Sequence, residues 1–260
     1  MSESRGHTAV RAQKRPRISD GEPWQKYELF PTPPWATRAL FERALVGLDV
    51  DTPCVVCEPA AGLGHMSAVI AEYASVCYAN DIHIYPLAGG GDTGDFVYRS
   101  DFLDPSQILS PVEWFIGNPP FGLADRFLGR ALKLATVGVA FLLRMQWLET
   151  EGRYKAIYTR TPPTRVAQFV ERVPMCEGGW DPKASTATAY AWFIWVRDEH
   201  GEWPRPRIDL TFPFFLIPPG CKKVLTRESD AELAARFVPG FVPPSTLRKS
   251  GKKQLGMELA

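Results

Sequence analysis

The segment Val55-Val56-Cys57-Glu58-Pro59-Ala60-Ala61-Gly62-Leu63-Gly64-His65-Met66 decides how this chain folds. It starts as an apolar strand, ends that strand on an acidic residue, and turns through two glycines into a helix. The glycines allow a tight turn close to a ligand, and the helix start offers free amide donors. The loop lacks the lysine of a phosphate-binding loop, and Ser67 replaces the third glycine of a dinucleotide fingerprint. An acid before the turn would repel a pyrophosphate, so we expect a cofactor with an ammonium group.

Short apolar runs alternate with helical patterns on both sides of this segment. The expected strands are 54–57, 76–80, 97–100, 114–117, 137–143, 166–170 and 190–196, and the clearest helices are 36–46, 65–73 and 123–135. Strands that are apolar on both faces and alternate with helices predict an α/β fold with a mostly parallel, helix-covered sheet. Such sheets bind ligands beyond the carboxyl ends of their strands, so the candidate site lies there.

Length and composition favour one folded body with polar ends. The chain has 260 residues, of which 45% are hydrophobic, which excludes disorder throughout. We expect a disordered basic tail at 1–26, a folded domain at 27–225, and a Pro-rich, basic and partly disordered tail at 226–260. The first 20 and the last 16 residues each carry a net charge of +3, while the whole chain carries +1. Basic tails favour a polyanionic partner, although solubilising tails explain either end alone equally well.

The compartment and the cysteines point to an intracellular protein without a metal. No stretch reaches the roughly 18 apolar residues of a membrane helix, and the first residues are polar and basic rather than a signal peptide. A soluble, cytoplasmic protein is therefore expected, associated with the nucleoid through its substrate. Cys54 and Cys57 form a C-x-x-C pair, which raises the alternatives of a redox or a zinc role. Because a zinc site needs a second pair, core packing of reduced thiols is favoured.

Two further strands end on acids. Asn80-Asp81 closes the second strand and Ser100-Asp101 the third, and Asp95 is a weaker rival to Asp101. An acid after the second strand can hold two ribose hydroxyls, and one after the third can accept from an adenine amine. Each acid alone is as well explained as a solvated turn residue, because Asp favours turns. Three acids at three successive strand ends favour a nucleoside pocket.

The fourth strand is followed by Gly117-Asn118-Pro119-Pro120-Phe121. The two prolines fix an extended backbone without two amide donors, so carbonyls such as that of Pro119 are free to accept. The side-chain oxygen of Asn118 is a second acceptor, and two fixed acceptors can orient a planar exocyclic amine. Phe121 adds a flat apolar face on which a base can stack. An ordinary turn remains the alternative for this motif.

The two loops together, EPAAGLG and NPPF, resemble the S-adenosylmethionine-dependent amino-methyltransferases, particularly the DNA adenine-N6 methyltransferases. The upstream run at 27–35, YELFPTPPW, resembles the TP-containing segment that precedes the glycine loop in one subgroup. The resemblance covers roughly residues 27–196. It implies a Rossmann-like, seven-stranded, mostly parallel sheet with helices on both faces and the last strand antiparallel. One departure is the lengthened third-strand region at 86–92, which weakens the assignment of Asp101.

The resemblance also implies roles for individual residues. The residues expected to hold S-adenosylmethionine are Thr32, Pro33, Glu58, Pro59, Ala60, Gly62, Gly64, Asp81, Asp101 and Asn118. The expected catalytic residues are Asn118, Pro119, Pro120 and Phe121. Hydrogen bonds from both amine protons to Asn118 and Pro119 would favour the pyramidal amine of the transition state, and the product would be S-adenosylhomocysteine. No metal is required. In double-stranded DNA the target base must be flipped out of the stack.

Three other functions remain open at this point. An RNA methyltransferase acting on ribosomal adenine or guanine amines carries a similar NPPF-type loop, although the TP segment favours DNA. A nucleic-acid-binding relative without turnover is disfavoured by the intact Asn118 and Phe121. Methylation of a protein glutamine is disfavoured because Tyr usually closes that loop in the corresponding family.

Recognition of the polymer is expected from loops beside the site. The segments 144–165 and 176–189 should open on the cofactor-facing edge, and only 64 residues follow Val196. Candidate contacts to phosphate, or a wedge into the base stack, are Arg144, Trp147, Trp180 and Lys183. For each tryptophan, anchoring a loop on the core is an equally good explanation. So little surface predicts a relaxed target and salt-dependent binding.

Overall fold

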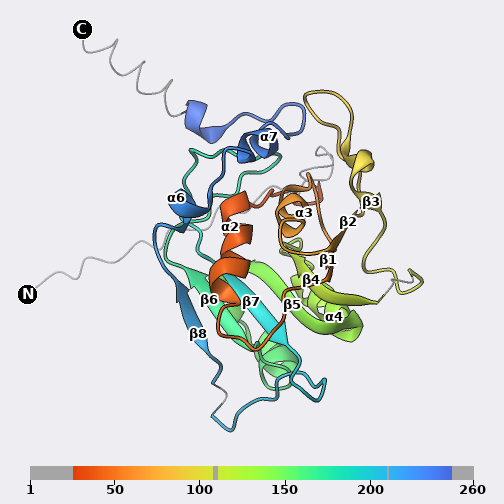
Figure 1. Cartoon of the computed structure of the whole chain (residues 1–260), viewed down its shortest axis with the longest axis vertical. Helices are drawn as coiled ribbons and strands as arrows, with labels where there is room; N and C mark the ends of the chain where they lie inside the picture. Colours follow the sequence, from red (N-terminus) through yellow and green to blue (C-terminus); the bar gives the residue numbers. More distant parts are fainter. Residues whose placement is uncertain (1–25, 108–110, 210, 248–260) are drawn as a thin grey trace, which may run out of the picture.

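The computed structural model describes residues 26–107, 111–209 and 211–247, and its centre is one eight-stranded sheet (Figure 1). The strands run in the order β3-β2-β1-β4-β5-β7-β6-β8. Their bounds are β1 Val55–Glu58, β2 Val76–Asp81, β3 Tyr98–Arg99, β4 Val112–Gly117, β5 Ala135–Arg144, β6 Arg165–Phe169, β7 Tyr190–Val196 and β8 Phe214–Ile217. Only β7 among them is antiparallel to its neighbours, β5 and β6.

The expected α/β class and the antiparallel β7 are confirmed, whereas the strand count is eight rather than seven. The additional strand, β8, pairs in parallel with β6 at the edge of the sheet. Its short apolar run lies between Pro213 and Pro218, and prolines at both ends give the run the pattern of a loop. The sheet therefore extends one strand beyond β6.

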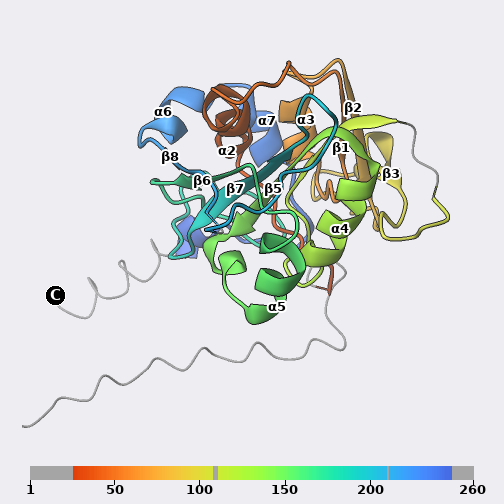
Figure 2. The ribbon, with the colours of Figure 1, turned by 90° about the horizontal axis from the view of Figure 1, so that it is seen from below.

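Helices cover both faces of the sheet (Figure 2). One face carries α2 (Pro34–Ala39), the π-helical turn η1 (Leu40–Ala44), α3 (His65–Ile70) and α6 (Cys221–Leu225). The other face carries α4 (Ala124–Leu134), the short α5 (Glu151–Arg153) and η4 (Tyr154–Tyr158). Alternate residues of β5 belong to the two cores, since Ala140 and Leu142 pack under α2 while Phe141 and Leu143 pack under α4. This alternation is the two-residue period of a strand buried on both faces.

The remaining helical elements are short, and two of the expected helices are not continuous α-helices over their predicted ranges. The expected helix 36–46 is split into α2 and η1, and the expected helix 65–73 continues past α3 only as a turn. The remaining elements are η2 (Thr93–Asp95), η3 (Met145–Leu148) and α7 (Asp230–Ala234). The run at 82–97 between β2 and β3 is a long connection with η2 as its helical turn.

Residues 226–247 pack against the body, although the sequence pattern predicts a tail from 226 onward. Arg38 of α2 is buried, and its guanidinium donates to Asp230 of α7 at 2.7 and 2.9 Å. The same group donates to Glu72 and to the carbonyl of Leu225. This bidentate, buried ion pair fixes α7 on α2, so the folded body extends past residue 225.

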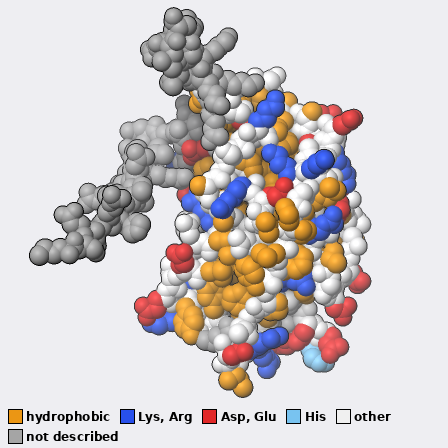
Figure 3. Space-filling model, turned by 90° about the vertical axis from the view of Figure 1, so that its left-hand side faces the viewer, with side chains coloured by type: hydrophobic (Ala, Val, Ile, Leu, Met, Phe, Trp, Pro, Cys, Tyr) orange, Lys and Arg blue, Asp and Glu red, His pale blue; other side chains and the backbone are white. Residues whose placement is uncertain are grey.

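The sheet edge formed by β8 is apolar on its outside. Figure 3 shows the side of the molecule on which β8 and α6 lie, where hydrophobic side chains gather. Phe214 and Leu216, two residues apart on β8, are both more than half exposed. Exposed apolar groups of this kind are a property of the edge and take no part in the site described below.

The five cysteines are free thiols, and four of them lie partly or fully inside the fold. Cys54 is the exception because it precedes β1 and is exposed, so the expected core position of Cys54 is wrong. Within the described residues, no helix combines the length and apolar character needed to cross a membrane.

Candidate active site

The carboxyl ends of parallel strands bring the candidate residues to one edge of the sheet. β1 ends at Glu58, β2 at Asp81, and β4 leads directly into Asn118. β5 ends at Arg144, which is paired across the sheet with Tyr190 of β7. Strand order alone therefore gathers side chains that are far apart in the sequence, as expected for a ligand site in this class of fold.

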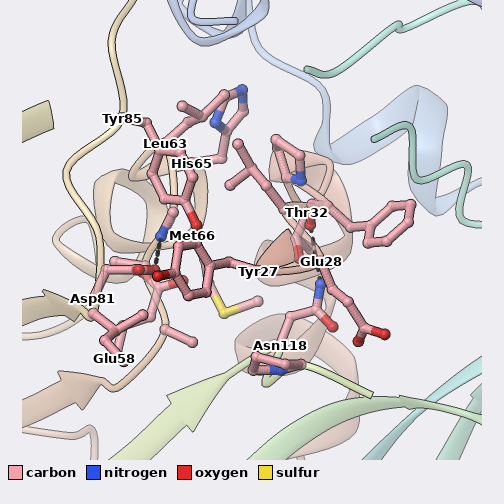
Figure 4. A pocket seen from close by; sticks show the side chains of 18 residues that line it. Tyr27, Glu28, Thr32, Glu58, Leu63, His65, Met66, Asp81, Tyr85 and Asn118 are labelled. Atoms are coloured by element: carbon pink, nitrogen blue, oxygen red, sulfur yellow. Dashed lines mark hydrogen bonds between the residues drawn. The ribbon is translucent and has the colours of Figure 1, made fainter. Parts of the chain in front are cut away.

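These strand ends surround a cavity of about 50 Å³, which is seen from close by in Figure 4. Glu58 and Asp81 lie together on one side, Asn118 and Glu28 lie on the other, and the side chain of Tyr27 lies between them in this view. The predicted cofactor residues that line the cavity are Thr32, Glu58, Ala60, Gly62, Asp81 and Asn118. Of the predicted catalytic residues, Asn118 and Pro120 line it.

The glycine loop closes one end of the cavity. Gly62 has a φ of +54°, in the left-handed region that favours glycine, and a Cβ at this position would lie 2.6 Å from Leu29. The backbone N–H of Gly62 donates to Asp81 at 2.8 Å, and the N–H of Ala61 donates to the carbonyl of Asn80 at 2.9 Å. The loop is therefore held against the end of β2, and a side chain at position 62 would strain the backbone and displace the end of the Leu29 side chain.

The two acids of the cavity are buried and close to each other. Burial raises the pKa of Asp81 to about 6, although it accepts hydrogen bonds from the N–H groups of Gly62 and His83. Burial raises the pKa of Glu58 well above its usual range, against the lowering effect of the hydrogen bond from the Ser67 hydroxyl, and the charge of Asp81 raises it further. Two such acids favour a ligand that brings a positive charge, because that charge stabilises their ionised forms.

Asn118 has one end of its carboxamide fixed and the other end free. Its Nδ2 donates to the carbonyl of Phe30 at 3.1 Å and approaches Sδ of Met175 at 3.6 Å. Its Oδ1 is buried and accepts no hydrogen bond from any residue within the described ranges. A flipped carboxamide would set two oxygens against each other, so the contact with Phe30 decides the orientation. Asn118 thus presents a buried, unpartnered acceptor.

Phe121 lies in an aromatic group, and one contact of its ring was not expected. The guanidinium of Arg144 lies over the Phe121 ring at 3.8 Å from the centroid, and Phe30 and Tyr190 lie at 5.6 and 6.4 Å. A cation over an aromatic face is an attractive contact. A base that stacked on this face would therefore have to displace Arg144.

The other predicted cofactor and catalytic residues do not line the cavity. Pro33 directly precedes α2, Gly64 directly precedes α3 and lies close to Phe96, and Pro59 and Pro119 are buried. Asp101 lies on an exposed turn, where it accepts from the N–H of Leu103 at 2.8 Å. In the structure Asp101 is therefore a solvated turn residue, which was the alternative explanation for this acid. The reason is that β3 is only two residues long and the chain turns away after it.

Of the residues predicted to contact nucleic acid, the two tryptophans are buried, whereas Lys183 is exposed. Trp147 is buried among Phe193 and Trp195, and its Nε1 donates to Asp125 at 2.8 Å. Trp180 is also buried. These two expectations are corrected, since both side chains are buried and Trp147 packs in the core. Lys183 is exposed on the loop between β6 and β7.

Several residues of the site were not predicted. Tyr27, Glu28, Phe30 and Tyr85 line the cavity, and so does His65, which contacts the buried Trp180 edge-on at 6.3 Å. Burial lowers the pKa of His65 to about 3, and the charge of Arg236 lowers it further. The sequence contains a signal for Tyr27, Glu28 and Phe30, because they belong to the TP-containing segment at 27–35. No group of three or more potential metal ligands occurs in the part of the chain that the structure describes.

The strand order, with an antiparallel β7 between β5 and β6, makes this a Rossmann-like, mostly parallel α/β sheet. No family model matches the sequence, and no curated protein sequence matches it either. Solved structures do match, and all three described next are methyltransferases.

The first is a subunit of a type I restriction-modification methyltransferase from Streptococcus thermophilus, with 13% identity, a TM-score of 0.48, and coverage of 81% of this chain and 59% of that one. The second is a protein from Pyrococcus horikoshii provisionally described as an RNA methyltransferase, with 18% identity, a TM-score of 0.46, and coverage of 68% and 90%. The third is magnesium protoporphyrin IX methyltransferase from Synechocystis with bound S-adenosylmethionine, with 14% identity, a TM-score of 0.42, and coverage of 70% and 88%. The three have different roles, so the substrate is argued from the residues of this chain.

Proposed function

We propose that this protein is an S-adenosylmethionine-dependent methyltransferase that methylates the exocyclic N6 amine of adenine in DNA. The observation that carries the proposal is the buried Oδ1 of Asn118, which has no partner among the described residues and belongs to a residue that lines the same cavity as Glu58 and Asp81. An acceptor in this position favours a ligand that brings an N–H or O–H donor, because an unpartnered buried acceptor is costly.

The residues of the cavity fit the proposed cofactor. Glu58 and Asp81 supply two buried acids for an ammonium group and for ribose hydroxyls, and the left-handed Gly62 brings the backbone close to the ligand. When bound, S-adenosylmethionine supplies a methyl group on a positively charged sulfur. The cavity is also lined by Thr32, Ala60 and Asn118, and Asn118 begins the segment at 118–121 that we call the catalytic loop. A cationic ligand agrees with the raised pKa values of the two acids, since it would favour their ionised forms.

The protein contributes orientation and electrostatics to the reaction. Oδ1 of Asn118 accepts one N–H of the substrate amine, and the rigid Pro119-Pro120 segment keeps that acceptor in place. An amine held in this way becomes more pyramidal, which frees its lone pair from the aromatic ring. The hydrogen bond strengthens as positive charge develops on the nitrogen, so it stabilises the transition state more than the ground state.

The base is expected to stack on Phe121 after Arg144 leaves that face. Arg144 is then free to contact a phosphate of the same strand, which exchanges one favourable interaction for another. In double-stranded DNA this requires flipping of the target nucleotide, whose unstacking is repaid by the contacts in the site. DNA is favoured over RNA by the resemblance of the segment at 27–35.

Methyl transfer to defined polymers tests the proposal. The protein is incubated with methyl-labelled S-adenosylmethionine and long duplex DNA, and separately with single-stranded RNA and with ribosomal RNA. Label in DNA that nucleotide-resolution mapping assigns to adenine N6 supports the proposal. Label in RNA alone would make the protein an RNA methyltransferase, and no label in any polymer despite cofactor binding would leave a binding protein.

A further inference from the structure

The segment at 27–32 covers the cavity and contacts the catalytic loop twice. Oε2 of Glu28 accepts a hydrogen bond from the backbone N–H of Phe121 at 2.7 Å. Two residues later, the carbonyl of Phe30 accepts from Nδ2 of Asn118 at 3.1 Å. Pro119 and Pro120 have no N–H, so the amide of Phe121 is the first donor after Asn118. Glu28 holds the only backbone N–H available within Pro119-Pro120-Phe121.

The same segment, which we call the covering segment, contacts the other loops of the site. Tyr27 stacks on His83 after β2 at a centroid distance of 5.3 Å, and Leu29 packs against Gly62 of the glycine loop. The carbonyl of Leu29 accepts from the N–H of Gly178 at 2.9 Å. The covering segment thus joins the glycine loop, the loop after β2 and the loop after β6 to the catalytic loop. Tyr27 and Glu28 of this segment are seen in Figure 4.

The covering segment forms one wall of the cavity, so a ligand of nucleoside size enters only when this wall moves aside. Residues 27–32 line the cavity continuously, and Glu28 has a φ of +53°, which is uncommon for a residue with a side chain. Such a backbone persists where surrounding contacts hold it. The contacts of Glu28 and Phe30 with the catalytic loop must change when the covering segment moves.

We propose that Glu28 is a positioning residue that couples closure of the covering segment over the cofactor to the placement of Asn118. With the segment closed, the carboxylate of Glu28 holds the Phe121 amide and the carbonyl of Phe30 turns Oδ1 of Asn118 toward the substrate amine. With the segment displaced, both bonds are broken and the catalytic loop has no fixed acceptor. This inference rests on the proposed function, and it assigns to Glu28 a role in methyl transfer rather than in cofactor affinity.

Three variants of Glu28 and one control separate this role from a general loss of structure. Glu28→Ala removes the acceptor, Glu28→Asp keeps the charge but shortens its reach, and Glu28→Gln keeps an oxygen at the same distance. Glu113→Ala is the matched control, because Glu113 also accepts from backbone amides, those of Cys54 and Val55, at the opposite end of the strands. Each protein is compared by its single-turnover rate with duplex DNA at saturating S-adenosylmethionine.

We expect Glu28→Ala and Glu28→Asp to lower that rate by about 10- to 100-fold, the range for removing a charge-assisted hydrogen bond. Glu28→Gln should stay within about 3-fold of the parent, and Glu113→Ala should lower the melting temperature while keeping the rate. A normal rate for Glu28→Ala, a defect that vanishes at saturating cofactor, or an equal defect in Glu113→Ala would overturn the positioning role.

A second measurement does not depend on activity. Hydrogen exchange of the Phe121 amide, resolved by NMR, should be faster in Glu28→Ala than in the parent and unchanged in Glu28→Gln. S-adenosylhomocysteine should slow this exchange in the parent and not in Glu28→Ala. Equal protection of the amide in all proteins would contradict the coupling. A parent that methylates no polymer would overturn the proposed function, whereas the exchange result would still decide whether Glu28 holds the catalytic loop.

Discussion

Asn118 combines a buried position with an unused acceptor, and this combination makes it the most informative single residue of the molecule. Its Nδ2 is fixed by Phe30, so the oxygen has one direction in which to accept. The NPPF motif predicts the residue and its role as acceptor. The partner that orients it comes from a segment 88 residues earlier.

Asn118→Ala is expected to reduce methyl transfer by at least about 100-fold, because it removes the acceptor that stabilises the developing charge on the amine. Binding of S-adenosylhomocysteine, measured by calorimetry, should change little, since the acids and the glycine loop remain. Methyl transfer within a few-fold of the parent would show that the catalytic site lies elsewhere.

His65 gives a prediction about pH. Its pKa is lowered to about 3 by burial, so the folded protein keeps this ring neutral where the unfolded chain, with a pKa of about 6.5, takes up a proton. The unfolded state therefore binds more protons between these values, and stability falls as the pH falls. Between pH 6.5 and 4 the contribution of His65 is up to about 3 kcal/mol.

His65→Met should remove that part of the pH dependence. The measurement is the free energy of unfolding by urea at several pH values from 4 to 7, compared between parent and variant. His200→Met is the control, because the His200 side chain is 78% exposed. A His65→Met variant with the same pH dependence as the parent would mean that His65 titrates normally in the fold.

At the scale of elements, α7 shows how a segment without strong periodicity becomes part of the body. The helix has only five residues, too few to be stable alone. It is held by the ion pair of Asp230 with the buried Arg38, and its Leu233 and the later Val238 are buried. Tertiary contacts stabilise it, which is why no clear helical pattern follows residue 225.

Asp230→Ala is expected to destabilise the protein by about 3 to 5 kcal/mol, because it leaves Arg38 buried with only part of its charge compensated. Urea denaturation measures the change. The control is Glu151→Ala, which breaks an exposed pair with Lys155 and should have no measurable effect. An equally small effect of Asp230→Ala would show that residues 226–247 contribute little to the fold.

Two elements show the limits of local patterns. β7 has the bounds that its pattern predicts, 190–196, because seven apolar and aromatic residues follow one another without a break. β8 is missing from the predicted strands because its four residues lie between prolines and gain their pairing only from β6. Asp101 is predicted in the cofactor site because it follows a strand, and the two-residue β3 ends too early to bring it there.

At the scale of the whole molecule, few of the predicted recognition residues are available for a polymer. Trp147 and Trp180 are buried, which leaves Arg144 at the site and Lys183 on the loop after β6. The loop after β6 is tied to the end of the described chain, since Oδ2 of Asp181 accepts from the N–H of Ser245 at 2.8 Å. Residues 248–260, which follow, contain four basic residues and one acidic residue.

We therefore expect a relaxed target, adenine with one or two fixed neighbours or nearly any adenine, and binding that depends on salt. Removing residues 248–260 should lower the slope of log affinity against log salt by about 0.9 for each phosphate that the shortened protein no longer neutralises. Fluorescence anisotropy with duplex DNA measures the slope, and mapping of methylated adenines measures the target. Methylation confined to one site of four or more base pairs, or an unchanged slope, would contradict this expectation.

The sequence by itself determined the fold class and the order of the loops, and it predicts Asn118 as an acceptor, because these depend on residues close together in the chain. Strand runs, the glycine turn and the two prolines are local patterns with direct physical consequences. Only the tertiary structure decided which groups meet at the site: the bonds of Glu28 and Phe30 to the catalytic loop span 93 and 88 residues. The order of strands in the sheet decides which loops become neighbours in space, and it also places Arg144 over Phe121. Contacts between strand ends have no periodicity along the chain, and so no local pattern predicts them.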